Sequence, residues 1–149
     1  MHTALPLAVV CFILGSQAQA PVPTGASYMF TQHVLGNEIS FSVKDKELNG
    51  ASEWLNPESD PPPLAIAEAV RTSRSELNRY VPNPEEWQVT AVNLRRLDAR
   101  AQWFYIVDWR LPKRGHVGDG VSIPVLMNGR AVIGEIRADP DTKKPKQNH

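Results

Sequence analysis

Cysteine is nearly absent from this chain of 149 residues, whose single cysteine is Cys11. One cysteine cannot close a disulfide within the chain, and a zinc site built from thiolates needs several. Packing alone must therefore stabilise the folded domain. Thiol nucleophiles and thiolate metal ligands are excluded from every residue that follows Cys11.

An excess of either charge is also missing, because 16 Lys and Arg residues balance 16 Asp and Glu residues. Nucleic-acid binding needs a clustered positive field. The basic pair Arg95 and Arg96 is short and has acidic neighbours, and the lysines of 143–146 lie in a polar tail with acids. We therefore expect no nucleic-acid partner, and we predict a disordered tail over 138–149.

The motifs of common enzymes are absent as well. The sequence contains no G-x-S-x-G elbow, no H-E-x-x-H pair and no phosphate-binding glycine loop. His33 and His116 have no second ligand at a metal-binding spacing, and Asp119 stands alone among glycines. We therefore predict that the protein is not an enzyme and uses no cofactor or metal. A minimal enzyme that uses His116 and Asp119 is an alternative.

What is present at the N-terminus is an apolar run over 5–14, followed by small residues at alternate positions. That pattern is typical of a signal peptide, and the run is roughly half the ~20 apolar residues of a membrane-spanning helix. Cleavage after Ala18 or Ala20 fits, although cleavage after Ala20 places Pro21 first. We therefore expect 1–20 to be a signal peptide, and the protein to be secreted or periplasmic without a stable membrane anchor.

The rest of the chain has the length of one domain. We expect a flexible N-terminal segment over 21–37, a folded domain over 38–137 and the tail over 138–149. Residues 28–37 fit either a strand or a loop. The proline-rich stretch 56–63 cannot continue a helix or strand, because proline lacks the amide donor and restricts the residue before it.

An amphipathic pattern predicts a helix from about 64 to 80. Its buried stripe is expected to consist of Ile66, Ala69, Val70, Ser73, Leu77 and Tyr80. Arg71 and Arg74 fall elsewhere, toward solvent, and Arg71 can pair with Glu68 one turn away. Neither Leu64 nor Ala65 offers a side-chain oxygen, so the helix should begin without a side-chain cap.

Alternating apolar residues predict strands over 39–44, 87–94, 103–111, 121–126 and 131–136. The segment 103–111 begins apolar on both faces, which is typical of a central strand. Asn128 and Gly129 predict a type I′ hairpin between the last two strands, and Pro124 should face a sheet edge. We predict an α+β domain in which one helix packs on a curled antiparallel sheet of about four to five strands.

This order of elements resembles the cystatin-like and PepSY-like exported domains, and a set of short secreted bacterial proteins of unassigned activity. The matching parts are the helix at 65–70, the Trp87-Gln88-Val89 stretch, the strand from Trp103 and the hairpin at 125–129. The resemblance implies a partner that is another exported protein or peptide. Cystatin inhibitors use a Gln-x-Val-x-Gly tip, whereas this chain has Val92 in place of the glycine.

The four tryptophans are the remaining unusual feature. They either fill a core without disulfides or form a binding surface. We select Trp54, Trp87 and Trp103 as candidate partner-binding residues, and Trp54, beside the prolines, as the best candidate for an exposed or capping aromatic. The predicted function is a non-catalytic exported binding or accessory domain. A peptidase-inhibitor-like or peptidase-regulating domain is the alternative, with a hairpin tip near 97–102. The ligand and the oligomeric state stay open.

Overall fold

The computed structural model describes residues 27–97, 102–112 and 120–138. Within these residues the elements are β1 (Ser27–Val34), β2 (Asn37–Lys44), α1 (Asp45–Leu48), α2 (Ile66–Leu77), the 3-10 turn η1 (Pro84–Glu86), β3 (Gln88–Arg96), β4 (Trp103–Arg110), β5 (Gly120–Leu126) and β6 (Glu135–Ala138). They form two antiparallel three-stranded sheets, ordered β1-β2-β6 and β3-β4-β5. The predicted α+β class is confirmed, but the prediction of one sheet with four to five strands is wrong.

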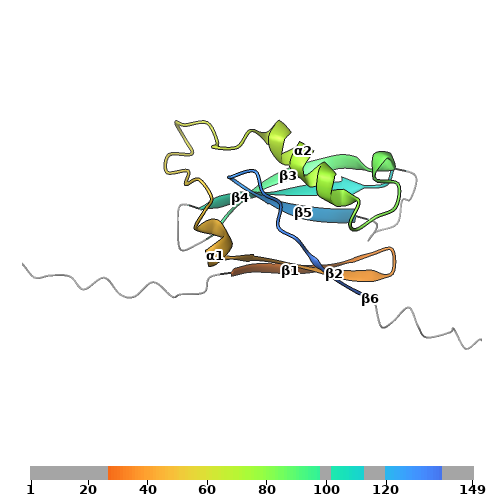
Figure 1. Cartoon of the computed structure of the whole chain (residues 1–149). Coiled ribbons are helices and arrows are strands. Elements are labelled where there is room, and N and C mark those ends of the chain that lie inside the picture. Colours follow the sequence, from red (N-terminus) through yellow and green to blue (C-terminus); the bar gives the residue numbers. More distant parts are fainter. Residues whose placement is uncertain (1–26, 98–101, 113–119, 139–149) are drawn as a thin grey trace, which may run out of the picture.

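The elements are arranged in three layers, with α2, the β3-β4-β5 sheet and the β1-β2-β6 sheet following one another (Figure 1). The alternation of side chains along β4 explains this order. Trp109 donates its indole N–H to Ser73 of α2, whereas Phe104 packs its ring against Tyr28 of β1. The strand is thus buried on both faces, and its predicted central position between β3 and β5 is confirmed.

Residues 28–37, for which the sequence fitted either a strand or a loop, belong to the first hairpin, formed by β1 and β2. Tyr28, Phe30 and Val34 face the core at alternate positions of β1, and the described part of the predicted flexible segment 21–37 is instead strand and turn. The polar Gln32 interrupts the apolar alternation and hides the strand in the sequence. Leu35 and Gly36 form the turn, both with positive φ (51° and 80°).

The predicted chain reversal at Asn128 and Gly129 is present, in a different form. The Gly129 N–H donates to the Leu126 carbonyl (2.9 Å), and the Leu126 N–H donates to the Arg130 carbonyl (2.8 Å). Gly129 has φ +81° but Asn128 does not have a positive φ, so the loop has three residues rather than a two-residue type I′ turn. The Asn128 carboxamide oxygen instead accepts the Arg130 N–H (3.1 Å).

The returning segment does not form the predicted strand over 131–136 beside β5. It makes one bridge, between Ala131 and Val125, and then crosses to the other sheet, where β6 pairs with β2. Gly134 permits the crossing, because an added Cβ would lie 2.8 Å from Ile39 and 2.9 Å from Phe41. The crossing divides the predicted single sheet into two.

Helix α2 is shorter than the predicted 64–80, and the expected burial of Ile66 is wrong, because Ile66 is 55% exposed. Leu64, which precedes the helix, packs against the core in its place. Ala65 caps the helix without a side-chain hydrogen bond, as predicted. Arg74, expected in solvent, is half-buried and donates to the carbonyls of Pro84 in η1 and of Trp87 just after it. The Glu68–Arg71 pair is confirmed.

Candidate functional site

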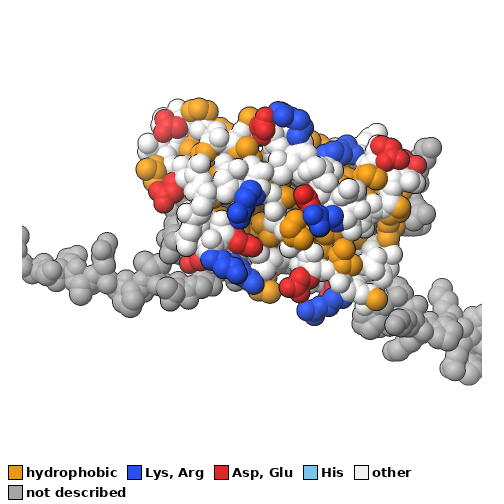
Figure 2. Space-filling model, in the orientation of Figure 1, with side chains coloured by type: hydrophobic (Ala, Val, Ile, Leu, Met, Phe, Trp, Pro, Cys, Tyr) orange, Lys and Arg blue, Asp and Glu red, His pale blue; other side chains and the backbone are white. Residues whose placement is uncertain are grey.

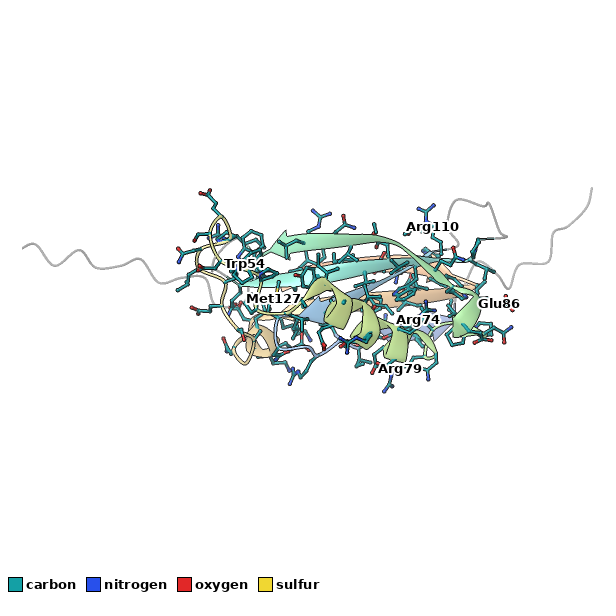
Figure 3. The ribbon with its side chains drawn as sticks, turned by 90° about the horizontal axis from the view of Figure 1, so that it is seen from above. Trp54, Arg74, Arg79, Glu86, Arg110 and Met127 are labelled. Carbon is teal, nitrogen blue, oxygen red and sulfur yellow. The ribbon has the colours of Figure 1, made fainter. Side chains whose placement is uncertain are left out.

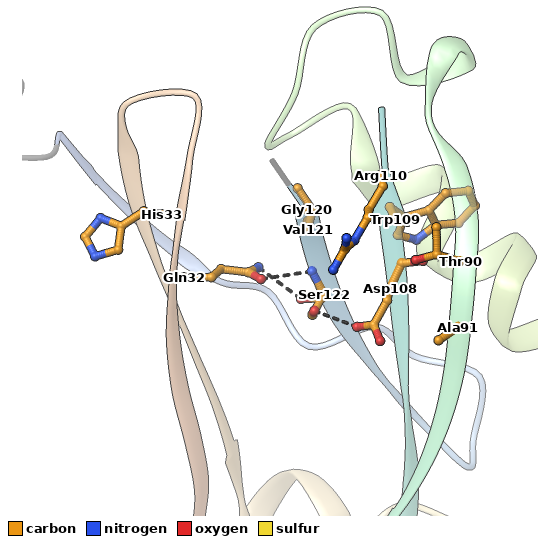
Figure 4. Close-up of a pocket in the computed structure, with 10 residues that line it drawn as sticks. All are labelled: Gln32, His33, Thr90, Ala91, Asp108, Trp109, Arg110, Gly120, Val121 and Ser122. Atoms are coloured by element: carbon orange, nitrogen blue, oxygen red, sulfur yellow. Dashed lines mark hydrogen bonds between the residues drawn. The ribbon is translucent and has the colours of Figure 1, made fainter. Parts of the chain in front are cut away.

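A groove of about 550 Å³ lies where β1 of one sheet faces β3, β4 and β5 of the other (Figure 4). The polar residues that line it are Gln32, His33, Thr90, Asp108, Arg110 and Ser122. They come from four strands and from both sheets, so the groove exists only because the chain divides into two sheets.

Asp108 occupies the floor of the groove and is held at both carboxylate oxygens. Its Oδ1 accepts the Ser122 hydroxyl (2.6 Å), and its Oδ2 accepts the Asn93 amide (2.7 Å). Ser122 is the cross-strand partner of Asp108 on β5, while Asn93 lies two residues from its β3 partner Ala91, on the same face. The register therefore fixes the direction of the carboxylate.

Gln32 connects the two sheets across the groove. Its carboxamide oxygen accepts the Ser122 main-chain N–H (2.9 Å), and its nitrogen donates to the Ser122 carbonyl (3.1 Å). One side chain thus satisfies both main-chain groups of a residue on the edge strand β5. Two residues along, the Pro124 carbonyl accepts the Val132 N–H on that outer side (2.9 Å). Because both main-chain groups of a strand residue point the same way, the missing Pro124 donor faces the edge, as predicted.

The groove presents both an acceptor and a donor. Asp108 and Ser122 are half-buried, and Arg110 is exposed on the same face of β4 as Asp108. The Arg110 side chain lies against Gly120, where an added Cβ would stand 3.6 Å from its Cγ. Across the described ranges, no Lys or Arg is ion-paired with Asp108. The side chains of Asn93 and Ser122 donate hydrogen bonds to its carboxylate.

This geometry suits binding better than nucleophilic chemistry. A serine nucleophile is normally activated by a histidine base, but Ser122 donates its hydroxyl to a carboxylate. The ring of His33 points away from Ser122 and Asp108 (Figure 4). The described part of the chain contains no group of three or more side chains that could hold a metal ion.

The predicted partner-binding tryptophans lie elsewhere. Trp87 is 2% exposed and Trp54 is 9% exposed, so both lie in the core, and of the two alternatives for Trp54 the exposed one is wrong. The Trp54 indole N–H donates to the Asp60 carbonyl (3.0 Å), so the polar atom of this buried ring has a hydrogen-bond partner. Trp103 is half-buried and meets Trp54 edge to face, with ring centroids 5.4 Å apart.

Two other predicted features fall outside the described residues. His116 and Asp119 belong to 113–119, and most of the predicted hairpin tip belongs to 98–101. Gln88 begins β3, so the stretch compared with the inhibitor tip lies in a strand.

The sequence reasoning missed the groove itself. In the sequence Asp108 resembles a surface acid beside Arg110, whereas its carboxylate accepts hydrogen bonds from Asn93 and Ser122. One pattern in the sequence could have indicated the groove. Gln32, Asp108 and Ser122 are polar residues that each lie on the inward face of an otherwise apolar strand.

No protein-family model, no curated protein and no solved structure matches this chain. The resemblance to cystatin-like and PepSY-like domains therefore stays a prediction. None of the helices in the described ranges has the length and apolar character to cross a membrane. On the face shown in Figure 2, basic and acidic side chains are interspersed over the surface.

Proposed function

We propose that the protein is a non-catalytic exported binding module, and that the groove at Asp108 holds a short peptide segment. The observation that carries the proposal is the Asp108 carboxylate, fixed in direction by Ser122 and Asn93 at the floor of a groove. A carboxylate that accepts two hydrogen bonds keeps further lone pairs for a donor on a ligand. Fixing it in advance lowers the entropy lost on binding.

A peptide fits the pair of charges that the groove presents. Its ammonium or side-chain cation would meet Asp108, while its carbonyls or carboxylate would accept from Arg110 on the same face of β4. The groove volume of about 550 Å³ falls within the range of small-ligand sites. Trp109 lines the groove but is only 1% exposed, and its indole N–H is directed to Ser73 on the opposite face. The groove therefore has little of the stacking surface that a sugar uses.

The test measures thermal unfolding with the tripeptides Ala-Lys-Ala, Ala-Ala-Ala and Ala-Glu-Ala, and with maltose. A ligand at ten times its dissociation constant stabilises the folded state by about 1.4 kcal/mol. We expect Ala-Lys-Ala to raise the midpoint most, because its cation faces Asp108. Asp108→Asn should abolish that preference and keep the fold, since the carboxamide is isosteric.

Glu58→Gln is the matched control, because it removes the same charge from an exposed loop residue remote in sequence from the groove strands. It should leave the response to Ala-Lys-Ala unchanged. The proposal fails if none of the peptides shifts the midpoint at millimolar concentration. Equal shifts in the wild type and in Asp108→Asn would also overturn it.

A further inference from the structure

Among the described residues, no strand pairs with the outer edge of β3. This strand is the edge strand of its sheet, and its residues are exposed except Ala91 and Val92, which are half-buried. The view from above shows α2 lying over the β5 side of the sheet and β3 running along the other margin (Figure 3). By contrast, the edge of β5 is covered by Gln32 and by the segment that contains Val132.

The hydrogen bonds on the far side of the sheet determine which main-chain groups of β3 face outward. The Pro124 carbonyl points away from β4, to the Val132 N–H. Its partner Ile106 must then point its main-chain groups away from β5, toward β3. Asn93, opposite Ile106, therefore faces β4. Inward and outward groups alternate along a strand, so those of Val92 and Leu94 face outward.

The side chains along this edge differ between the two faces. On the face toward α2, Val92 is half-buried, while Leu94 is 38% exposed and Val89 is 39% exposed. On the opposite face the same stretch carries Asn93 and Arg95. A strand placed beside β3 would thus meet an apolar row on one face and a polar row ending in a cation on the other.

We propose that an extended peptide with an acidic residue at one end adds to the outer edge of β3 as a fourth strand. Its main chain would exchange hydrogen bonds with Val92 and Leu94, its apolar side chains would cover Leu94, and its carboxylate would meet Arg95. β3 carries two arginines and no acid over Gln88–Arg96, so charge complementarity selects an acidic peptide over a second copy of β3.

The probe is the labelled peptide Glu-Val-Thr-Val-Thr, acetylated and amidated, whose glutamate faces Arg95 when it pairs antiparallel to β3. Fluorescence anisotropy measures its dissociation constant with the full chain. The control peptide Lys-Val-Thr-Val-Thr should bind up to about fivefold more weakly, the upper end expected for one exposed ion pair. A copy methylated at its main-chain nitrogens keeps the charge and loses the strand hydrogen bonds, so it should not bind.

Two variants of the chain test the two contacts separately. Leu94→Pro removes an outward N–H and leaves the ladder to β4 intact, so it should weaken binding about tenfold or more. Arg95→Glu should reverse the preference between the two peptides, whereas Arg71→Glu, which places the same charge change on an exposed residue of α2, should not. Circular dichroism confirms that each variant is folded.

Three results would overturn the proposal. The methylated peptide could bind as well as the parent, which would exclude strand pairing. The lysine peptide could bind the wild type as tightly as the glutamate peptide, which would exclude the role of Arg95. Sedimentation could show the chain associating with itself in a way that Leu94→Pro abolishes, which would make a second copy the occupant of the edge.

Discussion

Replacement of Arg74 by alanine should destabilise the fold strongly, although the residue sits on a surface helix. Its Nη1 donates to the Pro84 carbonyl (2.6 Å) and to the Trp87 carbonyl (2.8 Å). The guanidinium also lies 4.0 Å from the centre of the Trp109 ring. Arg74 thereby ties α2 to the turn η1 and to the start of β3, near the end of the molecule where Glu86 lies (Figure 3).

The magnitude follows from these contacts. A hydrogen bond to a charged group contributes about 1.5–3 kcal/mol, and a cation over an aromatic ring adds about 0.5–2 kcal/mol. Arg74 is only half-buried, and one nitrogen serves both carbonyls, so the lower ends of these ranges apply. We expect Arg74→Ala to lower the free energy of unfolding by about 2–3 kcal/mol. Arg74→Lys should retain a part of this, because a lysine keeps the charge and loses the planar group.

Arg71 provides the control, since it lies one turn earlier on the same helix, is exposed and pairs with Glu68. Arg71→Ala should cost about 0.2–0.5 kcal/mol. Urea unfolding followed by tryptophan fluorescence measures all three variants, because the core residues Trp87 and Trp109 report on the junction. If Arg74→Ala costs no more than Arg71→Ala, the junction contacts do not stabilise the fold and the reasoning is refuted.

Urea unfolding of three further variants tests the turn at Gly129, the crossing at Gly134 and the buried Tyr80 hydroxyl. Gly129→Ala should cost about 1 kcal/mol, because φ is +81° there, and a neutral result would contradict the loop assignment. Gly134→Ala should lower the free energy of unfolding by about 1–3 kcal/mol through overlap with Ile39 and Phe41. An unchanged free energy would mean that the two sheets can move apart to accommodate the methyl group. Burial raises the pKa of Tyr80 above the ordinary tyrosine value of 10.0. The stabilisation from this shift is complete below about pH 10 and is lost as pH rises through the folded pKa. Tyr80→Phe should flatten that alkaline loss and remove the acceptor of the Gly134 N–H, and an unchanged alkaline profile would contradict the role of burial.

The parts of the fold that the sequence predicts well are those whose cause is local. The alternation in β4 and the helical stripe through Ala69, Ser73 and Leu77 each follow from side chains a few residues apart. The absence of a side-chain cap at Ala65 can likewise be predicted from the sequence alone. These elements owe their positions to apolar periodicity, which survives in a single chain without any alignment.

The second sheet could not be predicted, because its cause is a contact between distant segments. β6 is four exposed residues long and has little apolar periodicity, and it joins β2 because Gly134 lets the backbone pass over Ile39 and Phe41. The strongest hairpin signal, at Asn128 and Gly129, correctly predicted a reversal. It could not predict that pairing would end after one bridge.

The groove could not be predicted either, because it also depends on contacts between distant segments. Gln32, Asp108 and Ser122 each interrupt an apolar face, and a polar residue at a core position must find partners. Taken singly, each resembles a surface residue near the end of a strand. Taken together, three interruptions on inward faces require a shared polar region, because each must satisfy the others or water. The network that joins Gln32 to Ser122 and Ser122 to Asp108 meets that requirement, and it places the groove between the sheets rather than on the helix.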